Sequence, residues 1–118
     1  MKNALLLDDN IAQLTVRELV LRKADIESHV ATNAQSALAL LRSETGQAKI
    51  GAVVTDHIMP GMDGVEFVRQ LRTFNREVPV IVISGLPDAD AEYAGLNVIF
   101  RVKPCDPEDL IALVKSAL

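Results

Sequence analysis

Three acidic side chains follow two apolar runs that lie far apart in this chain. Asp8 and Asp9 come directly after the run 4–7, and Asp56 comes after the run 50–55. A carboxylate that follows a buried parallel strand lies at the carboxyl edge of the sheet, where open α/β folds bind their ligands. Carboxylates gathered there repel one another unless a cation joins them, and their hard oxygens suit Mg²⁺. The spacing therefore predicts one acidic site that binds Mg²⁺.

A hydroxyl and an ammonium follow two further apolar runs. Ser84 ends the run 78–83, and Lys103 follows the run 98–102. A lysine is a compact point charge suited to a phosphoryl oxygen or a carboxylate, and a serine hydroxyl can bind an oxyanion. Each motif alone is also typical of a helix cap, a turn or a loop end, but their joint placement at strand ends favours one shared site. Such a site has the groups that phosphoryl transfer needs, with the Asp56 carboxylate as the nucleophile.

The elements that must position these residues alternate along the chain. Short runs rich in Val, Ile and Leu are typical of interior parallel strands, and a more polar run suits an edge strand. The interior strands are expected at 4–7, 50–54, 78–83 and 98–102, and the edge strand at 26–31. Helix-period segments lie at 10–23, 34–44, 64–74, 107–117 and, more weakly, 88–94. This alternation predicts right-handed crossovers and a parallel sheet covered on both faces, which is a three-layer α/β sandwich.

Helical periodicity predicts which helix faces are buried. In the segment 10–23 the arc expected to face the sheet holds Ala12, Val16, Leu19, Val20 and the stem of Lys23. Leu14 and Leu21 fall near the opposite side, either as a partner-docking stripe, through ordinary broad burial of the helix, or as isolated exposed leucines. In the segment 64–74 the expected core stripe is Val65, Val68 and Leu71.

Three residues near the predicted site are expected to take no part in its chemistry. Gly64 is expected to adopt an unusual backbone angle before the next helix, after a tight Pro-Gly turn. His57 is expected to point away from Asp56, because side chains alternate along a strand. Cys105 has no nearby histidine, so we expect an inert thiol.

Length and composition limit the class of protein. The chain has 118 residues with 49% hydrophobic content, which suits one domain and is too short for two of typical size. A net charge of -4 and an aromatic content of 3% argue against direct nucleic-acid binding. The single cysteine excludes an internal disulfide. No apolar segment approaches the roughly 20 residues that cross a bilayer, so we expect no membrane contact and a cytoplasmic location.

Taken in order, the motifs resemble the receiver domain of bacterial two-component response regulators over essentially all 118 residues. The motifs are Asp8-Asp9, Asp56, Met59-Pro60, Met62-Asp63-Gly64, Ser84, Phe100 and Lys103-Pro104. The resemblance implies a single receiver domain over residues 1–118. It also implies a flavodoxin-like, doubly wound α/β fold with five parallel strands in the order 2-1-3-4-5.

The resemblance further implies a function. Asp56 would accept a phosphoryl group from a phosphohistidine on a sensor kinase or a phosphotransfer protein, and Ser84 and Lys103 would bind the phosphoryl oxygens. The implied Mg²⁺ ligands are Asp9, Asp56, the backbone carbonyl of Ile58 and, largely through water, Asp8. The peptide bond before Pro104 would be cis. Such a domain assists its own phosphorylation and dephosphorylation without being an enzyme.

Several residues near the phosphoryl group would control the switch. Phe100 matches the aromatic residue that turns inward when the Ser84 hydroxyl moves to the phosphoryl group; an ordinary core aromatic is the alternative. Gly85 stands where alanine is common in the family, which keeps the donor's path open and loosens the loop. Ile58 and Leu86 are apolar and cannot orient a hydrolytic water, so we expect slow autodephosphorylation.

The surface that would carry the output departs from the family pattern. The chain between the fourth and fifth strands is shorter than usual, and the segment 86–95 supports only a short or partly unwound helix. The family often dimerises or signals through this helix, the fifth strand and the last helix, so a homodimer is one expected contact. The output is expected through a downstream protein partner, or the chain is a receiver piece of a longer protein with an effector domain, such as a hybrid kinase.

Three other classes of protein fit the sequence less well than a receiver domain. A phosphohydrolase with an aspartyl-phosphate intermediate needs Asp-x-Asp after the first strand, and Asp8-Asp9-Asn10 does not supply it. A nucleotide-binding module needs a glycine-rich phosphate loop, which the sequence lacks. A pseudo-receiver, which binds proteins without phosphorylation, stays as the alternative, although the set of acids, Ser84 and Lys103 argues against it.

Overall fold

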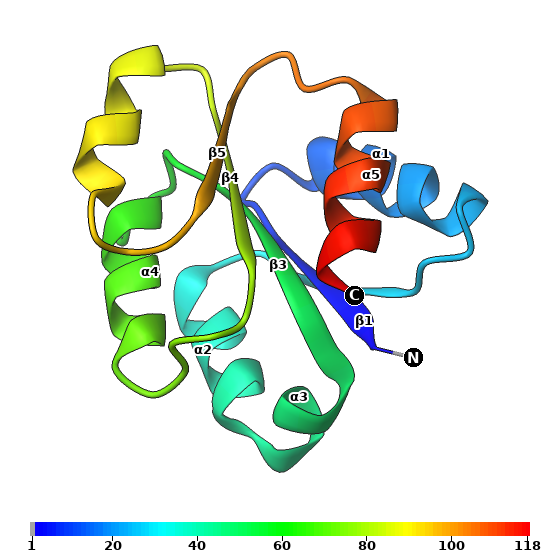
Figure 1. Ribbon diagram of the computed structural model, residues 1–118, viewed down its shortest axis with the longest axis horizontal. Coiled ribbons are helices and arrows are strands. Elements are labelled where there is room, and N and C mark those ends of the chain that lie inside the picture. The colour runs from blue at the N-terminus through cyan, green and yellow to red at the C-terminus, as the bar shows by residue number, and fades with distance from the viewer. Residues whose placement is uncertain (1) are drawn as a thin grey trace.

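Five strands form one parallel sheet in the order β2-β1-β3-β4-β5, with helices on both faces (Figure 1). The computed structural model describes residues 2–118. The strands are β1 (Asn3–Leu7), β2 (Ser28–Ala31), β3 (Ile50–Asp56), β4 (Val80–Ser84) and β5 (Ile99–Val102). The predicted flavodoxin-like fold class is confirmed. The expectation of an interior strand at 98–102 was wrong, because β5 is an edge strand that pairs only with β4 and is half-buried to exposed.

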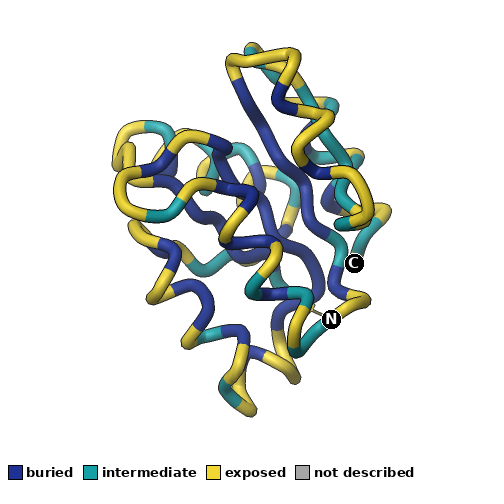
Figure 2. The backbone as a smooth tube through the Cα atoms, turned by 90° about the vertical axis from the view of Figure 1, so that its left-hand side faces the viewer, coloured by how far each residue is buried: buried dark blue, intermediate teal, exposed yellow. Residues whose placement is uncertain are grey.

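The helices divide between the two faces of the sheet. They are α1 (Ile11–Lys23), α2 (Ala34–Arg42), α3 (Glu44–Lys49), α4 (Gly64–Arg72), the 3-10 helix η1 (Pro87–Tyr93) and α5 (Pro107–Ala117). Because side chains alternate along a strand, Leu5 and Leu7 share a core with α2 and α4, while Ala4 and Leu6 share one with α1 and α5. Strands β1, β3 and β4 are buried along most of their length, whereas the edge strands β2 and β5 are largely half-buried or exposed. Figure 2 shows buried segments in the interior of the molecule and exposed ones on its outer turns.

Side-chain caps define where four of the helices begin. Each cap residue accepts a hydrogen bond from the backbone amide three residues further on, which satisfies one of the free donors of a helix start. The caps are Asn10, Asn33, Ser43 and Asp63. The cap at Asn10 limits the β1–α1 connection to a few residues, so Asp8 and Asp9 lie between the strand end and the helix start.

The buried face of α1 is not the face that the helical wheel predicts. Leu14 and Leu21 are buried at 4% and 0% exposure, whereas Val16 and Leu19 are 59% and 47% exposed. The predicted face was wrong because apolar residues lie all around this helix and define no single stripe.

The other helices agree with the sequence more closely. The predicted stripe of α4 is confirmed, because Val65, Val68 and Leu71 are all buried. The segment expected at 34–44 divides at Ser43, whose extended backbone ends α2 while its hydroxyl caps α3. The weak segment near 88–94 is the short 3-10 helix η1. Within residues 2–118, no helix combines the length and apolar content that crossing a bilayer needs.

Gly64 is required for close packing, and not for its backbone angle. The glycine with a left-handed angle in this loop is Gly61, at φ 80°. A Cβ at Gly64 would clash with the Tyr93 hydroxyl and lie 2.9 Å from the Asp56 carbonyl oxygen. The prediction of an unusual angle at Gly64 was therefore wrong, and the position instead allows α4 to start against the end of β3.

Arg72, the last residue of α4, holds two connections together. Its guanidinium donates hydrogen bonds to four backbone carbonyls at 2.8–3.2 Å. The acceptors belong to Asn75, Val78, Leu96 and Asn97. Partial burial lowers the pKa of this guanidinium from its usual value, but an arginine stays charged. The α4–β4 connection and the η1–β5 connection are thus tied to one cation.

Candidate functional site

The ends of β1 and β3 place two acidic residues at the same edge of the sheet. The two strands pair in parallel as far as Leu7 and Thr55, so Asp8 and Asp56 follow side by side. Asp8 is 0% and Asp56 is 7% exposed, whereas Asp9 is exposed. The structure therefore places two of the three predicted acids inside the edge and the third at its surface.

Lys103 contacts Asp56 directly. Its Nζ lies 3.0 Å from each oxygen of the Asp56 carboxylate. The Lys103 amide donates a hydrogen bond of 2.7 Å to the Ser84 carbonyl, which fixes the end of β5 beside the end of β4. The Lys103–Pro104 peptide bond is cis. The Lys103 ammonium therefore reaches the acidic edge from the end of β5.

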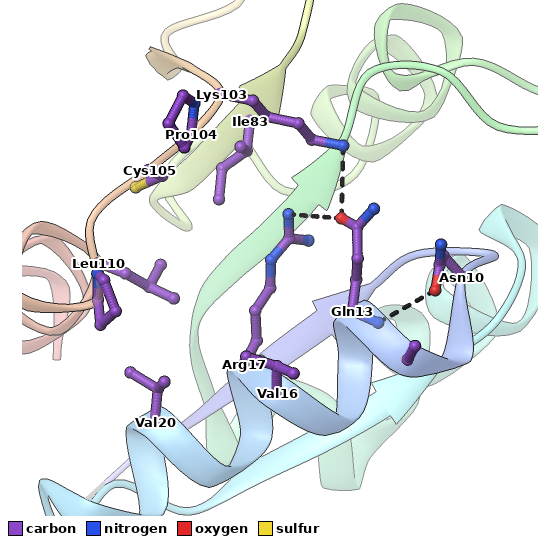
Figure 3. Close-up of a pocket in the computed structure, with 12 residues that line it drawn as sticks. Asn10, Gln13, Val16, Arg17, Val20, Ile83, Lys103, Pro104, Cys105 and Leu110 are labelled. Carbon is purple, nitrogen blue, oxygen red and sulfur yellow. Dashed lines mark hydrogen bonds between the residues drawn. The ribbon is translucent and has the colours of Figure 1, made fainter.

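Asp8 is held by a backbone amide and by an arginine. The Asn10 amide donates to Asp8 Oδ1 at 2.9 Å, and Arg17 Nη1 lies 3.2 Å from Asp8 Oδ2. Gln13 Oε1 accepts from Arg17 Nη2 at 3.2 Å and from Lys103 Nζ at 3.4 Å (Figure 3). One continuous polar network therefore links Asp8 to Asp56 through two protein cations and one amide.

The environment of Asp8 disfavours its charge. Burial, above all, raises the pKa of Asp8 above its usual value, and the nearby charge of Asp56 also raises it. The hydrogen bond from the Asn10 amide and the charges of Arg17 and Lys103 act in the opposite direction. The net direction is upward, so Asp8 is a buried acid that needs positive charge close to it.

The loops around Asp56 are open to the surface. The Ser84 hydroxyl is buried and bonds the Leu86 backbone, accepting from the amide at 2.9 Å and donating to the carbonyl at 3.4 Å. A Cβ at Gly85 would meet no atom within 4 Å. Ile58 and Leu86 are 61% and 49% exposed. The surface around Ser84 and Asp56 is therefore formed by small and apolar groups.

His57 faces a separate cluster on the other side of the β3 end. Its Nδ1 lies 2.7 Å from the Tyr93 hydroxyl, and its Nε2 lies 3.5 Å from a Glu92 oxygen. Tyr93 is buried, and burial above all raises the pKa of its hydroxyl, which stays protonated. The Tyr93 ring packs against the half-buried Phe100 with 5.9 Å between centroids. A chain of contacts thus joins the residue after Asp56 to Phe100.

The residues at this edge fit Mg²⁺ by the chemistry of their donors. Asp8, Asp9, Asp56 and the Ile58 carbonyl supply only hard oxygens, and the charge of Asp56 acts on the buried Asp8. Among residues 2–118, no three acidic, histidine or cysteine side chains stand close enough together to hold an ion as they are placed. Arg17 and Lys103 instead satisfy the buried acids.

An apolar groove opens between α1 and α5 beside this network (Figure 3). It encloses about 560 Å³, and its walls include Val16, Val20 and Leu110. Cys105 also lines it, and burial, followed by the charge of Asp109, raises the pKa of the thiol. A thiol with a raised pKa is a poor nucleophile.

Four polar residues near the site or in its supporting loops were not predicted: Gln13, Arg17, Arg72 and Tyr93. A signal for Arg17 does exist, because it lies three residues after Leu14 and four before Leu21, on the buried side of α1. Tyr93 is the only tyrosine of the chain, in a segment whose helix was weakly indicated.

Comparisons with known proteins agree with this architecture. Residues 4–115 match the response regulator receiver domain family. The chain is 38% identical over 117 residues to transcriptional regulatory protein PrrA of Mycobacterium tuberculosis, covering 97% of this chain and 48% of that protein. It is 31% identical over 121 residues to cyclic di-GMP phosphodiesterase response regulator RpfG of Xanthomonas campestris pv. campestris, covering 98% and 32%. The structure of the Vibrio cholerae chemotaxis protein CheY4 is similar with a TM-score of 0.86 and 26% identity, covering 100% of this chain and 99% of that chain.

A doubly wound parallel sheet with acids, a hydroxyl and a lysine at one carboxyl edge is the architecture of a two-component signalling domain. The chain belongs to the response regulator receiver domain family. Such domains are generally signalling domains and not enzymes, and their phosphorylation generally depends on Mg²⁺. The chain spans about a third to a half of the length of the two curated relatives, at 32% and 48%.

Proposed function

We propose that Asp56 is the phosphoacceptor and that residues 1–118 form a single receiver domain. An Asp56 oxygen attacks the phosphorus of a phosphohistidine, the P–N bond breaks, and the imidazole leaves with the bonding electrons and takes up a proton. The observation that carries the proposal is the contact of Lys103 Nζ with both Asp56 oxygens at 3.0 Å. An ammonium held there can neutralise charge on the phosphoryl oxygens.

The acidic edge supplies the second part of the proposal. The residues proposed to hold Mg²⁺ are Asp9, Asp56, the backbone carbonyl of Ile58 and, through water, Asp8. A bound Mg²⁺ would supply charge neutralisation for the carboxylates and the phosphoryl oxygens. Asp9 is exposed and reachable from solvent, while Asp56 lies just inside the edge with Lys103 beside it. The chain's own groups therefore orient the acceptor before a donor arrives.

Ser84 and Phe100 are the proposed switch residues. The Ser84 hydroxyl is engaged with the Leu86 backbone, so binding a phosphoryl oxygen requires it to leave that partner. An acyl phosphate adds about one to two negative charges at the edge, which favours such a move. Phe100, half-buried beside Tyr93, would then turn into the space that Ser84 leaves. The altered surface is the one formed by η1, β5 and α5.

Intact-mass measurement after treatment with acetyl phosphate tests the acceptor. We expect wild type to gain one phosphoryl group in the presence of Mg²⁺ and none without it. Asp56→Asn should gain none, because an amide cannot form the acyl phosphate. Asp90→Asn, an exposed aspartate of η1, is the matched control and should behave as wild type. If wild type gains no mass even from a phosphohistidine donor protein, the pseudo-receiver alternative replaces this proposal.

Slow loss of the phosphoryl group is a further expected property. Ile58 and Leu86 are exposed apolar residues beside the edge, and neither can hydrogen-bond a water. Ile58→Asn or Leu86→Glu should speed hydrolysis about tenfold, because a polar side chain can orient the attacking water. The measurement is the decay of the phosphorylated mass after donor removal. Val30→Asn, on the exposed part of β2, is the control, and equal decay in all variants would contradict the role of these loops.

The proposed partners follow from the family and not from a surface of this chain. Response regulators interact with histidine kinases and effector domains. We propose a sensor histidine kinase or phosphotransfer protein as the donor, and as the output a downstream protein, an effector domain or a second copy of the chain. No direct nucleic-acid or membrane contact is proposed, and the proposed location is cytoplasmic. The two relatives are named a transcriptional regulatory protein and a cyclic di-GMP phosphodiesterase response regulator, so their names indicate two different outputs.

A further inference from the structure

Arg17 lies beside the acidic edge but has no role in the proposed phosphoryl transfer. It belongs to α1, yet its side chain is only 12% exposed and its guanidinium reaches Asp8, whose side chain is 0% exposed. Asp8 Oδ1 is taken by the Asn10 amide at 2.9 Å and Oδ2 by Arg17 Nη1 at 3.2 Å. Both carboxylate oxygens of a proposed Mg²⁺ ligand are therefore already bound by protein groups.

The local balance of charge explains why an arginine lies there. A buried carboxylate is unfavourable without a partner, and Asp56 adds a like charge close to Asp8. Arg17 on Asp8 and Lys103 on Asp56 neutralise the pair, and Gln13 Oε1 accepts from both cations at 3.2 and 3.4 Å (Figure 3). The protein thus satisfies its acidic edge with its own cations.

We propose that Arg17 is a built-in counter-ion that competes with Mg²⁺ for Asp8 and sets the Mg²⁺ concentration at which the site fills. This inference rests on the proposed Mg²⁺ site of the phosphoacceptor. A guanidinium and a divalent cation repel each other, and Arg17 holds the Asp8 oxygen that is not bound to the backbone. Gln13 offers Arg17 a second acceptor, so the guanidinium keeps one hydrogen bond when Asp8 is released to the ion.

Removal of the Arg17 charge should destabilise the Mg²⁺-free domain and strengthen the binding of Mg²⁺. Without Mg²⁺, Arg17→Met leaves Asp8 buried beside Asp56 with no arginine, which lowers the unfolding temperature. For Mg²⁺, the same change removes a competing positive charge, which tightens binding. A merely structural Arg17 would lower stability and leave the Mg²⁺ affinity unchanged. An Arg17 that orients Asp8 for the ion would weaken binding when removed.

Calorimetric titration with MgCl₂, without any phosphodonor and at constant ionic strength, separates these cases. We expect the Kd for Mg²⁺ of Arg17→Met to fall about tenfold or more, the size expected for removing one close charge. Arg22→Met is the matched control, because Arg22 is on the same helix with 68% of its side chain exposed. Arg17→Lys keeps the charge but loses the fork, so its Kd should lie between those of wild type and Arg17→Met.

Each outcome decides the inference. A Kd of Arg17→Met that equals or exceeds that of wild type overturns it, and so does the absence of Mg²⁺ binding by both proteins. Binding by Arg17→Met alone supports it. If Arg17→Met is unfolded without Mg²⁺, refolding on Mg²⁺ addition followed by circular dichroism gives only an apparent Kd that includes the cost of folding, and the comparison with wild type is then made with the folded Arg17→Lys, whose Kd must be the lower of the two. Because no phosphodonor is present, failure of Asp56 to accept a phosphoryl group leaves this result unaffected.

Discussion

Arg72→Met should lower the free energy of unfolding by about 3 kcal/mol, since hydrogen bonds to a charged group contribute about 1.5–3 kcal/mol each and are not fully additive. The guanidinium donates to four backbone carbonyls at 2.8–3.2 Å. These carbonyls belong to the α4–β4 and η1–β5 connections, and no other side chain of residues 2–118 hydrogen-bonds to both. Methionine keeps the aliphatic length and the helix propensity of arginine, so the loss reports the hydrogen bonds. Urea denaturation followed by circular dichroism measures it.

Two further variants test whether the fork geometry of Arg72 matters. Arg72→Lys keeps the charge but cannot spread donors over four acceptors, so it should recover less than half of the lost stability. Arg69→Met, one turn earlier and exposed, should stay within about 0.5 kcal/mol of wild type. Equal stabilities of Arg69→Met and Arg72→Met would show that the four carbonyls find other partners.

The strands and the acidic edge could be predicted because they depend on local patterns. Interior parallel strands are continuous apolar runs, and a residue that follows such a run must lie at the carboxyl edge. Asp8, Asp56, Ser84 and Lys103 are each one step beyond, or at the end of, an apolar run, so their common edge follows from strand order alone. The core stripe of α4 is equally local, since its apolar residues recur with the helical period.

The polar groups that surround the acids could not be predicted in the same way. Their positions depend on the rotation of α1, and apolar residues on every side of that helix leave the rotation undetermined. Because Leu14 and Leu21 turn inward, Arg17 also turns toward the sheet and reaches Asp8. Arg72 looks like an ordinary cation in the last turn of a helix, and only the fold brings the carbonyls of Leu96 and Asn97 to it.

Among substitutions that keep Asp56, we expect a change of Lys103 to slow phosphorylation most. Lys103→Met should slow phosphoryl incorporation from acetyl phosphate about 100-fold, the usual loss when one preorganised charge or donor is removed from the reacting oxygens. The ammonium contacts both Asp56 oxygens at 3.0 Å while 31% of its side chain is exposed, so it can follow the transferred group without a large loss of packing. Time-resolved intact mass at saturating Mg²⁺ measures the rate.

The yield separates a slowed reaction from a missing acceptor. Lys103→Met keeps Asp56, so its mass should still increase by one phosphoryl group at long times, whereas Asp56→Asn never gains it. Lys115→Met, an exposed lysine in the last turn of α5, changes the net charge equally and should keep the wild-type rate. A Lys103→Met rate within twofold of the Lys115→Met rate would mean that the ammonium only balances the resting charge of Asp56. The contact seen in the unphosphorylated domain would then contribute to stability and not to catalysis.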